Sequence, residues 1–370
     1  MRALAACLAI ALALAAAPAR AAERGAYVGV VDAGSSASRL YVYKITPGEQ
    51  AIEDVLELGA TTAPLAAFAD QPAKAGGAAI GPLLGALDRE LALHVLATGG
   101  MRLAPAPAAR AIEASVRRAV MEGGYKPGRT ETISGEMEGF YAWLDVNVLL
   151  GRLAPGRTPV GVVEIGGASM QAAYAGAPAA DPGVVTASYG GQTYSVRSVS
   201  LLGLGAEQAR KSLLAGASAA SCFPTGLVTD RPDLQDLNGA FDATRCTAAF
   251  AGIVAGPAQG FPRDEIKDVS FIGLGRPLTG VLADWRLAQD RPAALKDSAS
   301  QNCALPWAGF TAAFGATPYT PYLCMNSIYL ATLLFDPAGF GLRAEQVVAA
   351  ERLAGRRPSW TRGAALMLRD

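Results

Sequence analysis

The sequence predicts an α/β protein of two related lobes, each a mixed sheet flanked by helices, with a cleft between them. Three observations lead to this prediction. The chain has 370 residues, 51% of them apolar and only 17% charged, which is enough to bury a sizeable core and is typical of two domains. The segment 30–43 is matched by a similar segment at 162–174. In both, strand-forming residues flank a turn of very small residues, and a repeat at this separation indicates related lobes.

The first 22 residues have the composition of a cleaved secretory signal. Arg2 is followed by an Ala/Leu-rich run, and an A-x-A pattern ends at Ala21. We therefore expect the mature chain to begin near Ala22 or Glu23, in the periplasm or outside the cell. No later apolar run is long enough to span a bilayer, so no membrane anchor is expected after cleavage. The formal net charge is zero and well mixed, which argues against nucleic acid as a partner.

The repeat places one acid at a strand end in each lobe. At a constant offset of 132 residues, the aligned residues are Asp32 with Glu164, Gly34 with Gly166, and Ser35 and Ser36 with Gly167 and Ala168. Backbone N–H groups and serine hydroxyls of such a turn can bind a phosphate, while the acid can hold a hydrated cation. Two facing copies would bind a polyphosphate chain, with one divalent ion bridging its oxygens.

Two further segments are expected at this cleft. An apolar strand near 92–97 runs into Thr98, two glycines and Arg102, and a Ser-Gly turn at 134–135 precedes Glu136, Glu138 and an apolar helix. Hydrolysis of a phosphoanhydride needs a water held in line with the leaving oxygen, and a carboxylate near the metal can accept its proton. We interpret Glu138 as this base. The alternative is an acidic first helical turn that the helix dipole favours.

Ser169 and Gln171 alternate along the strand after the second turn, so they face the same side and could hold the same water. The single histidine, His94, lies in an apolar run and is expected to be buried in a strand. Without other histidines, histidine-based triads and zinc sites with two or three histidines are excluded.

Four cysteines remain once the predicted signal is removed, all in the second half of the chain. An even number in an exported chain predicts two disulfides. Three pairings are possible, of which the sequential one, Cys222–Cys246 with Cys303–Cys324, closes the shortest loops. Metal binding by these cysteines is disfavoured, because the chain has no C-x-x-C motif.

Taken together, these segments resemble the ecto-nucleoside triphosphate diphosphohydrolases, or apyrases, within the actin, hexokinase and Hsp70 superfamily. The similar motifs are DAGSSASR at 32–39, ATGGMRL at 97–103, SGEMEGFYAWLDVNVLL at 134–150, VVEIGGASMQ at 162–171, PYLCMNSIYLATLL at 321–334 and WTRGAAL at 360–366. The resemblance implies two RNase H-like lobes with an interlobe active site. We expect the first lobe at 23–138 plus 341–370 and the second at 139–340, with a helix-like stretch at 343–355 that crosses back.

The resemblance also implies an activity, namely metal-dependent hydrolysis of nucleoside tri- and diphosphates to the monophosphate and phosphate, with Mg²⁺ or Ca²⁺. It implies that Glu138 is the base, that Ser169 and Gln171 hold the water, and that Asp32 and Glu164 bind the metal through waters. The implied phosphate-binding residues are Gly34, Ser35, Ser36, Arg39, Thr98, Arg102, Gly166, Gly167 and Ala168. Cys303 and Cys324 resemble the family's last disulfide. A monomer is expected.

This chain departs from the family pattern at two places. Glu164 stands where an aspartate is usual, and the longer side chain should shift the metal. The stretch FIGLGRPLTGV at 271–281 lacks the aromatic residues that stack a nucleobase in apyrases. Arg276 could cover a base face instead, or the base could meet Tyr322 or Tyr329.

Two other functions stay open from the sequence. Exopolyphosphatases and guanosine pentaphosphate phosphohydrolases of the same superfamily have similar hairpins and an SGxEE motif, and they need no base-stacking surface. The segments GMRL at 100–103 and EGFYAWLDVNVLLG at 138–151 look more like apyrase. A third possibility is a non-catalytic sensor that closes on a nucleotide. The presence of Glu138, Ser169 and Gln171 argues against it.

Overall fold

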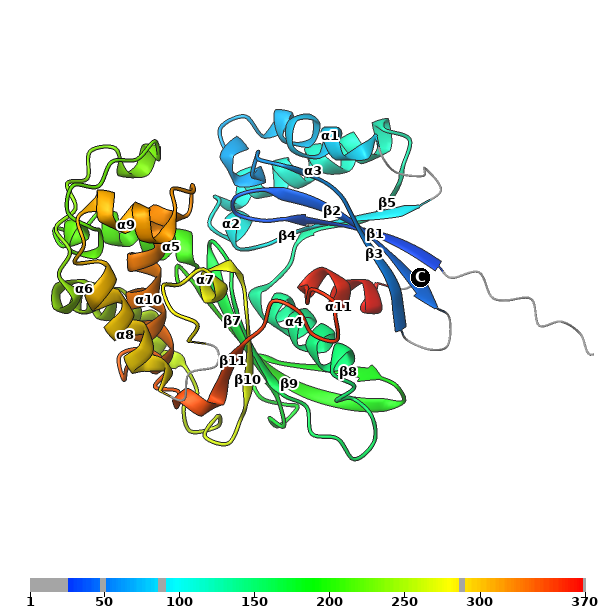
Figure 1. Cartoon of the computed structure of the whole chain (residues 1–370). Helices are drawn as coiled ribbons and strands as arrows, with labels where there is room; N and C mark the ends of the chain where they lie inside the picture. The colour runs from blue at the N-terminus through cyan, green and yellow to red at the C-terminus, as the bar shows by residue number, and fades with distance from the viewer. Residues whose placement is uncertain (1–25, 47–50, 86–90, 286–289, 369–370) are drawn as a thin grey trace, which may run out of the picture.

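Two mixed β-sheets form the framework of the protein (Figure 1). The structure, a computed structural model, describes residues 26–46, 51–85, 91–285 and 290–368, so the predicted signal at 1–22 lies outside the described residues. The first sheet has the order β3-β2-β1-β4-β5 and the second the order β11-β10-β6-β7-β9-β8. The prediction of a two-lobed α/β fold is therefore confirmed.

The first sheet combines a meander with two parallel strands. Its strands are β1 (Ala26–Ala33), β2 (Ser38–Thr46), β3 (Ala51–Thr61), β4 (Ala92–Ala97) and β5 (Lys126–Thr132). The first three are antiparallel neighbours, and β4 and β5 add in parallel beside β1. Valines and tyrosines dominate the central hairpin because branched and aromatic side chains suit a pleated, half-buried surface.

The second sheet repeats this arrangement. Its strands are β6 (Gly161–Ile165), β7 (Ser169–Ala175), β8 (Val184–Tyr189), β9 (Gln192–Leu202), β10 (Phe271–Leu274) and β11 (Val347–Ala349). The β6–β7 hairpin corresponds to β1–β2, β9 to β3, and the parallel strands β10 and β11 to β4 and β5. The topology thus agrees with the repeat found in the sequence.

Strand β11 changes the expected return of the chain to the first lobe. The helix predicted at 343–355 is wrong, because the segment has a 3₁₀ turn at Ala344–Gln346 followed by β11. Val347 and Ala349 are buried and Val348 is 40% exposed, as in an edge strand. The 138/139 boundary also falls inside one continuous helix, α4. We therefore propose that the chain returns to the first lobe after Ala349 rather than at residue 341.

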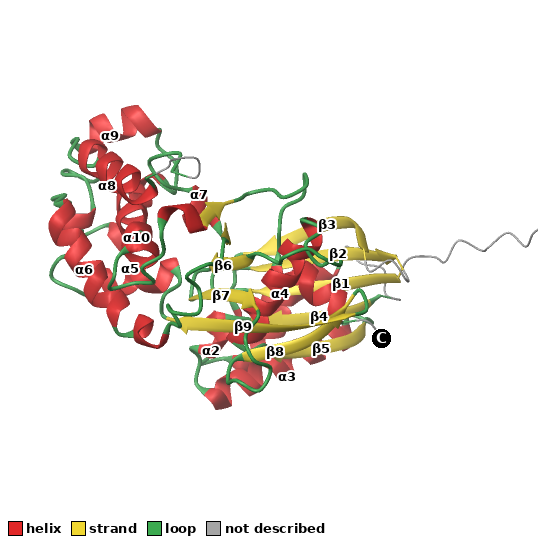
Figure 2. Cartoon of the chain, turned by 90° about the horizontal axis from the view of Figure 1, so that it is seen from below, coloured by secondary structure: helices red, strands yellow, loops and turns green. Residues whose placement is uncertain are grey.

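Helices fill the space between the sheets and cover both outer faces (Figures 1 and 2). The central pair consists of α4 (Gly135–Leu149), which packs on the second sheet, and α11 (Trp360–Met367), which packs on the first sheet and on α4. The other helices are α1 (Gly81–Leu84), α2 (Gly99–Arg102), α3 (Ala106–Glu122), α5 (Ala206–Leu214), α6 (Ala243–Ala255), α7 (Arg276–Thr279), α8 (Arg291–Asn302), α9 (Trp307–Phe314) and α10 (Leu323–Phe335).

The strand period of two distributes each strand's side chains between two cores. Val30 and Val162 contribute to the core that contains Trp143 of α4 and Trp360 of α11. The residues that follow them, Val31 and Val163, contribute to the outer cores under α3 and under α6 and α10. Both central strands are therefore apolar on both faces, as expected for strands covered by helices on each side.

Both predicted disulfides form, and both lie in the helical layer of the second lobe. Cys222 pairs with Cys246 on α6, and Cys303, at the end of α8, pairs with Cys324 on α10. Their Cα atoms are 5.0 and 5.9 Å apart. Two disulfides fit an oxidising compartment. In the described part of the chain, no helix is long and apolar enough to cross a bilayer.

Candidate active site

The two hairpins carry their acids at equivalent positions. Asp32 lies at the end of β1 opposite Arg39, and Glu164 lies in β6 opposite Gln171. Each turn is closed by a hydrogen bond from a glycine N–H. The Gly34 N–H donates to the Ala37 carbonyl at 2.9 Å, and the Gly166 N–H donates to the Ser169 carbonyl at 3.0 Å. The repeated sequence thus produces the same turn twice.

The turns of the two lobes approach each other closely, and glycines permit this approach. A Cβ on Gly99 would lie 2.9 Å from the Cβ of Ala168, and a Cβ on Gly167 would collide with Ser35. Gly100 meets Ser35 from within the first lobe, where a Cβ would lie 2.9 Å from its Cα. The small residues of both motifs are therefore required for the lobes to meet at this point.

One acid at this meeting point was not predicted. Glu207 lies in the first turn of α5, whose N-terminus packs on the second hairpin through the Glu207 N–H and the Gly167 carbonyl at 2.9 Å. The Ser35 hydroxyl donates to Glu207 Oε2 across the lobes at 3.3 Å. An acid in a first helical turn is common, so the sequence holds no signal for this contact.

Glu138 projects from the first turn of α4 into the same region. Ser134 caps the helix by accepting a hydrogen bond from the Met137 N–H at 3.2 Å, so the Ser-Gly turn predicted a helix start correctly. Gly135 and Gly139 allow α4 to approach β9, since a Cβ on either would collide with Ser200 or Ser198. This packing leaves Glu138 only 7% exposed.

Ser169 and Gln171 face the same side of β7, as the strand period predicts, and Gln171 contacts Glu138 directly. The Gln171 amide donates to Ser169 Oγ at 2.8 Å and to Glu138 Oε2 at 3.2 Å. Gln171 Oε1 is buried and has no hydrogen-bond partner among the described residues. The amide also donates to Ser200 Oγ at 3.2 Å, which adds a residue that sequence reasoning missed.

Arg102, which the sequence analysis places on the substrate phosphates, makes its contacts here within the candidate site. Its Nη2 donates to Glu138 Oε2 and to Ser169 Oγ, both at 2.8 Å. Thr98, just before α2, is 5% exposed, and its N–H reaches the Ala33 carbonyl at 3.3 Å. The segment ATGGMRL therefore lies against both hairpins, as predicted, but its arginine contacts the base candidate.

Three carboxyl groups converge in the site, and the pKa of each is raised, in every case first by burial. Loss of hydration and the charge of Glu138 raise the pKa of Asp32 to about 7, against the opposing effect of Arg39. Burial raises the pKa of Glu138 too, and Arg102 opposes this. The pKa of Glu164 lies well above its usual value, first because of burial and then because of the nearby acids.

This arrangement of acids fits a cation bound through water. Glu164 Oε2 is buried without a hydrogen-bond partner, although both Glu164 and Asp32 keep part of their surface exposed. Across the described ranges, no group of three or more acids, histidines or cysteines could ligate a metal directly. A hydrated divalent ion would relieve the repulsion among the acids, and it needs oxygen groups as partners for its waters.

The comparisons with known proteins agree with this geometry. The sequence model of the GDA1/CD39 (nucleoside phosphatase) family matches residues 19–228. The chain belongs to this family. It is therefore a hydrolase of the nucleoside phosphatase class, and the resemblance to apyrases is confirmed.

Relatives of this GDA1/CD39 protein match over most of its length. The chain is 27% identical to probable apyrase 2 of Oryza sativa subsp. japonica, over 86% of this chain and 79% of the relative. It is 29% identical to a nucleoside-triphosphatase of Pisum sativum, over 89% and 83%. A nucleoside triphosphate hydrolase structure from Neospora caninum has a TM-score of 0.60 at 16% identity, covering 92% of each chain. A Ppx/GppA structure from Aquifex aeolicus has a TM-score of 0.51 at 16% identity, covering 92% and 97%. Both structures share the fold.

The nucleobase residues expected in the GDA1/CD39 protein are mostly buried. Tyr329 is 0% and Tyr322 6% exposed, and the Tyr322 hydroxyl donates to Asp233, so the structure presents neither ring to a base. Tyr319, which sequence reasoning missed, is 60% exposed and accepts a hydrogen bond from Arg276 Nη1 at 2.7 Å. The Arg276 guanidinium lies 5.6 Å from this ring's centroid. Arg276 and Tyr319 form the exposed cation–aromatic pair at this position.

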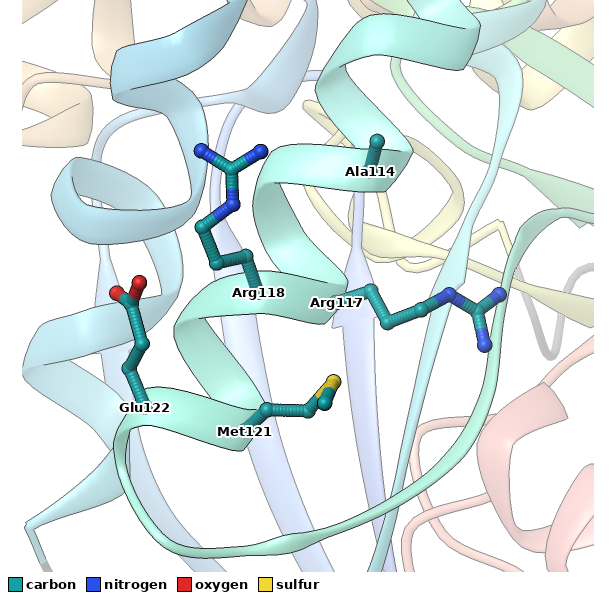
Figure 3. A pocket seen from close by; sticks show the side chains of 5 residues that line it. All are labelled: Ala114, Arg117, Arg118, Met121 and Glu122. Atoms are coloured by element: carbon teal, nitrogen blue, oxygen red, sulfur yellow. The ribbon is translucent and has the colours of Figure 1, made fainter.

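A hollow of about 540 Å³ on the surface of α3 is separate from these residues (Figure 3). It is lined by Ala114, Arg117, Arg118, Met121 and Glu122. All five come from one helix, so no polar groups from different elements converge there. We do not assign a ligand to it.

Proposed function

We propose that this protein hydrolyses nucleoside tri- and diphosphates to the monophosphate and phosphate, with a water activated by Glu138. One observation carries the proposal. The carboxylate of Glu138, from α4, accepts a hydrogen bond from Gln171 of the second hairpin at 3.2 Å and shares Arg102 Nη2 with Ser169, at the point where the turns of both lobes converge. A base, two water-holding groups and two phosphate-binding turns are the parts that phosphoanhydride hydrolysis needs.

The residues divide the reaction between them. Ser169 and the free Oε1 of Gln171 hold the attacking water, and Glu138 accepts its proton as the water oxygen bonds to the terminal phosphorus. The bond from phosphorus to the bridging oxygen breaks, and its electron pair leaves with the shortened nucleotide. Backbone N–H groups of the two turns, with Ser35, Ser36 and Arg39, stabilise the charge on the phosphate oxygens. Thr98 and Ala168 shape the space between the turns.

Asp32 and Glu164 would hold Mg²⁺ or Ca²⁺ through waters. Their raised pKa values and the unpartnered Glu164 Oε2 support this assignment. When bound, the cation supplies charge neutralisation to the phosphate oxygens. Glu164 is longer than the aspartate usual in apyrases, so it reaches further from β6 toward the cleft. The exposed pair of Arg276 and Tyr319 would contact the base by one face only, which favours lax base selectivity.

The activity is tested by phosphate release from ATP, ADP, GTP, UDP and long-chain polyphosphate, with Mg²⁺, Ca²⁺ or EDTA. We expect release from tri- and diphosphates and none in EDTA, because the acids cannot hold the polyphosphate without a cation. Release from polyphosphate alone would instead assign an exopolyphosphatase. Nucleotide binding without release from any substrate would assign a sensor.

We also propose that the protein acts as a monomer in the periplasm or outside the cell. The signal-like composition of 1–22 and the two disulfides support this location. The mass of the chain recovered from the exported fraction tests the proposed location and the removal of the signal. Cleavage before Ala22 or Glu23 is expected, and an intact N-terminus on the exported chain would contradict the signal assignment.

A further inference from the structure

Arg102 makes three hydrogen bonds that join three separate segments of the chain. Its Nη2 reaches Glu138 Oε2 on α4 and Ser169 Oγ on β7, both at 2.8 Å. Its Nη1 reaches the carbonyl of Ile133, just before α4, at 3.1 Å. The side chain is 15% exposed and that of Glu138 is 9% exposed, so water screens this ion pair weakly. The guanidinium thus links the proposed base to one of the proposed water-holding residues.

The hydrogen bonds to Glu138 are all on one oxygen. Oε2 accepts from Arg102 at 2.8 Å and from Gln171 at 3.2 Å. Within the described part of the chain, no hydrogen bond reaches Oε1. A base needs one oxygen held in place and the other free to take a proton. The arrangement therefore orients Glu138 for the role proposed above.

Arg102 would lose these contacts if it bound the substrate. Both N–H groups of Nη2 already have acceptors, Glu138 and Ser169, and one on Nη1 has the Ile133 carbonyl. A bidentate phosphate contact would require the guanidinium to leave Glu138. That carboxylate would then remain in a buried site without its cationic partner, which is costly.

We propose that Arg102 is a positioning residue, which fixes Glu138 and Ser169 around the attacking water and does not bind substrate phosphate. The proposal rests on the function proposed above. It assigns to Arg102 an effect on turnover rather than on affinity, because the aligned base matters most while the proton is transferred.

The charges around Glu138 determine a second effect. The charged groups that face it are Arg102 from α2, Asp32 from β1 and Glu164 from β6, while β7 and β9 present only neutral groups. Arg102 is the cation among them. Its removal leaves the base among acids, and the acidic limb of the kcat profile should then move to higher pH.

The test compares Arg102→Gln with wild type and with Arg118→Gln, a matched change at an exposed arginine of α3 (Figure 3). For Arg102→Gln with ATP and Mg²⁺ we expect kcat to fall about 100-fold, KM to stay within about threefold, and the acidic limb to rise. Arg118→Gln should change none of these. Arg102→Lys keeps the charge and should recover about tenfold of the loss.

A second comparison isolates the action through Glu138. In a Glu138→Gln background, Arg102→Gln should change kcat by less than about tenfold, because the base that it positions is already absent and only its contact with Ser169 is lost. A KM raised tenfold or more with kcat preserved, or fully additive losses in the double variant, would overturn the proposal and assign Arg102 to the phosphate. If Arg102→Gln does not fold, the same measurements of kcat and KM on Arg102→Lys decide between the positioning role and the phosphate-binding role. Wild-type inactivity on all nucleotides would reject the proposed function itself.

Discussion

Glu138→Gln is expected to lower kcat for ATP hydrolysis about 1,000-fold while nucleotide affinity stays within about threefold. Glutamine has nearly the volume of glutamate, so α4 and its contact with Gln171 can persist. The amide cannot accept the proton of the attacking water, and the loss therefore falls on the chemical step. Initial rates of phosphate release give kcat, and a titration with a non-hydrolysable ATP analogue gives the affinity.

Glu136→Gln is the matched control, since Glu136 lies in the same first turn of α4 and is more exposed than Glu138. The same carboxylate-to-amide change there should leave kcat unchanged. Equal loss in the two variants would indicate that the helix end, rather than the base, is responsible. Full activity of Glu138→Gln would place the base elsewhere and remove the central assignment of the site.

The two hairpins and the segments that carry the site residues could be predicted from the sequence, because the chemistry of neighbouring residues determines them. Small residues between strand formers specify a tight turn, and the strand period puts Ser169 and Gln171 on one face. Asp32 and Glu164 follow at the strand ends for the same reason. The helix that begins after Ser134 was visible from its cap and its acids.

The partners of Arg102 and Glu207 could not be read from the sequence. Arg102 meets Glu138 and Ser169 from 36 and 67 residues away, and Glu207 meets Ser35 from 172 residues away. Such contacts depend on how α2 and α5 pack against the opposite hairpin. In the sequence, an arginine beside two glycines is as consistent with a phosphate contact as with the observed contact to Glu138 and Ser169.

Burial also distinguishes tyrosines that the sequence alone does not rank as contacts for a nucleobase. Tyr322 and Tyr329 lie at the start of α10 and within it, where the apolar surroundings bury them, whereas Tyr319 precedes the helix and is exposed. Residues 343–349 include helix formers, yet Val347–Ala349 pair in parallel with β10 and form β11. Tertiary pairing outweighed local propensity there.

Asp145→Ala is expected to reduce the free energy of unfolding by about 3–5 kcal/mol at pH 8, since it leaves a buried arginine without its counter-ion. Asp145 on α4 is 0% exposed, and its Oδ1 lies 3.5 Å from Arg362 Nη1 of α11. Its Oδ2 accepts from the Ser359 N–H at 2.7 Å. Chemical denaturation followed by tryptophan fluorescence measures the change, because Trp143 and Trp360 are buried in the same core.

The double variant Asp145→Leu with Arg362→Met separates charge from packing. Asp145 Oδ1 and Arg362 Nε and Nη1 have no hydrogen-bond partner among the described residues, so the pair is imperfectly satisfied. Apolar replacement of both should then recover most of the loss. A double variant as unstable as Asp145→Ala would show that α4 and α11 need these side-chain shapes rather than charge balance.

The pH dependence of the Asp145→Ala loss provides an independent check. Burial raises the pKa of Asp145 to about 7, and the opposing contacts of Arg362 and Ser359 do not offset it. A carboxyl whose pKa rises on folding binds more protons in the folded state between the two pKa values. Its stabilising contribution is complete below its unfolded pKa of about 3.9 and declines as the pH rises through about 7. The loss in Asp145→Ala should therefore be larger at pH 5.5 than at pH 8, and the opposite trend would mean that Arg362 lowers this pKa by more than burial raises it.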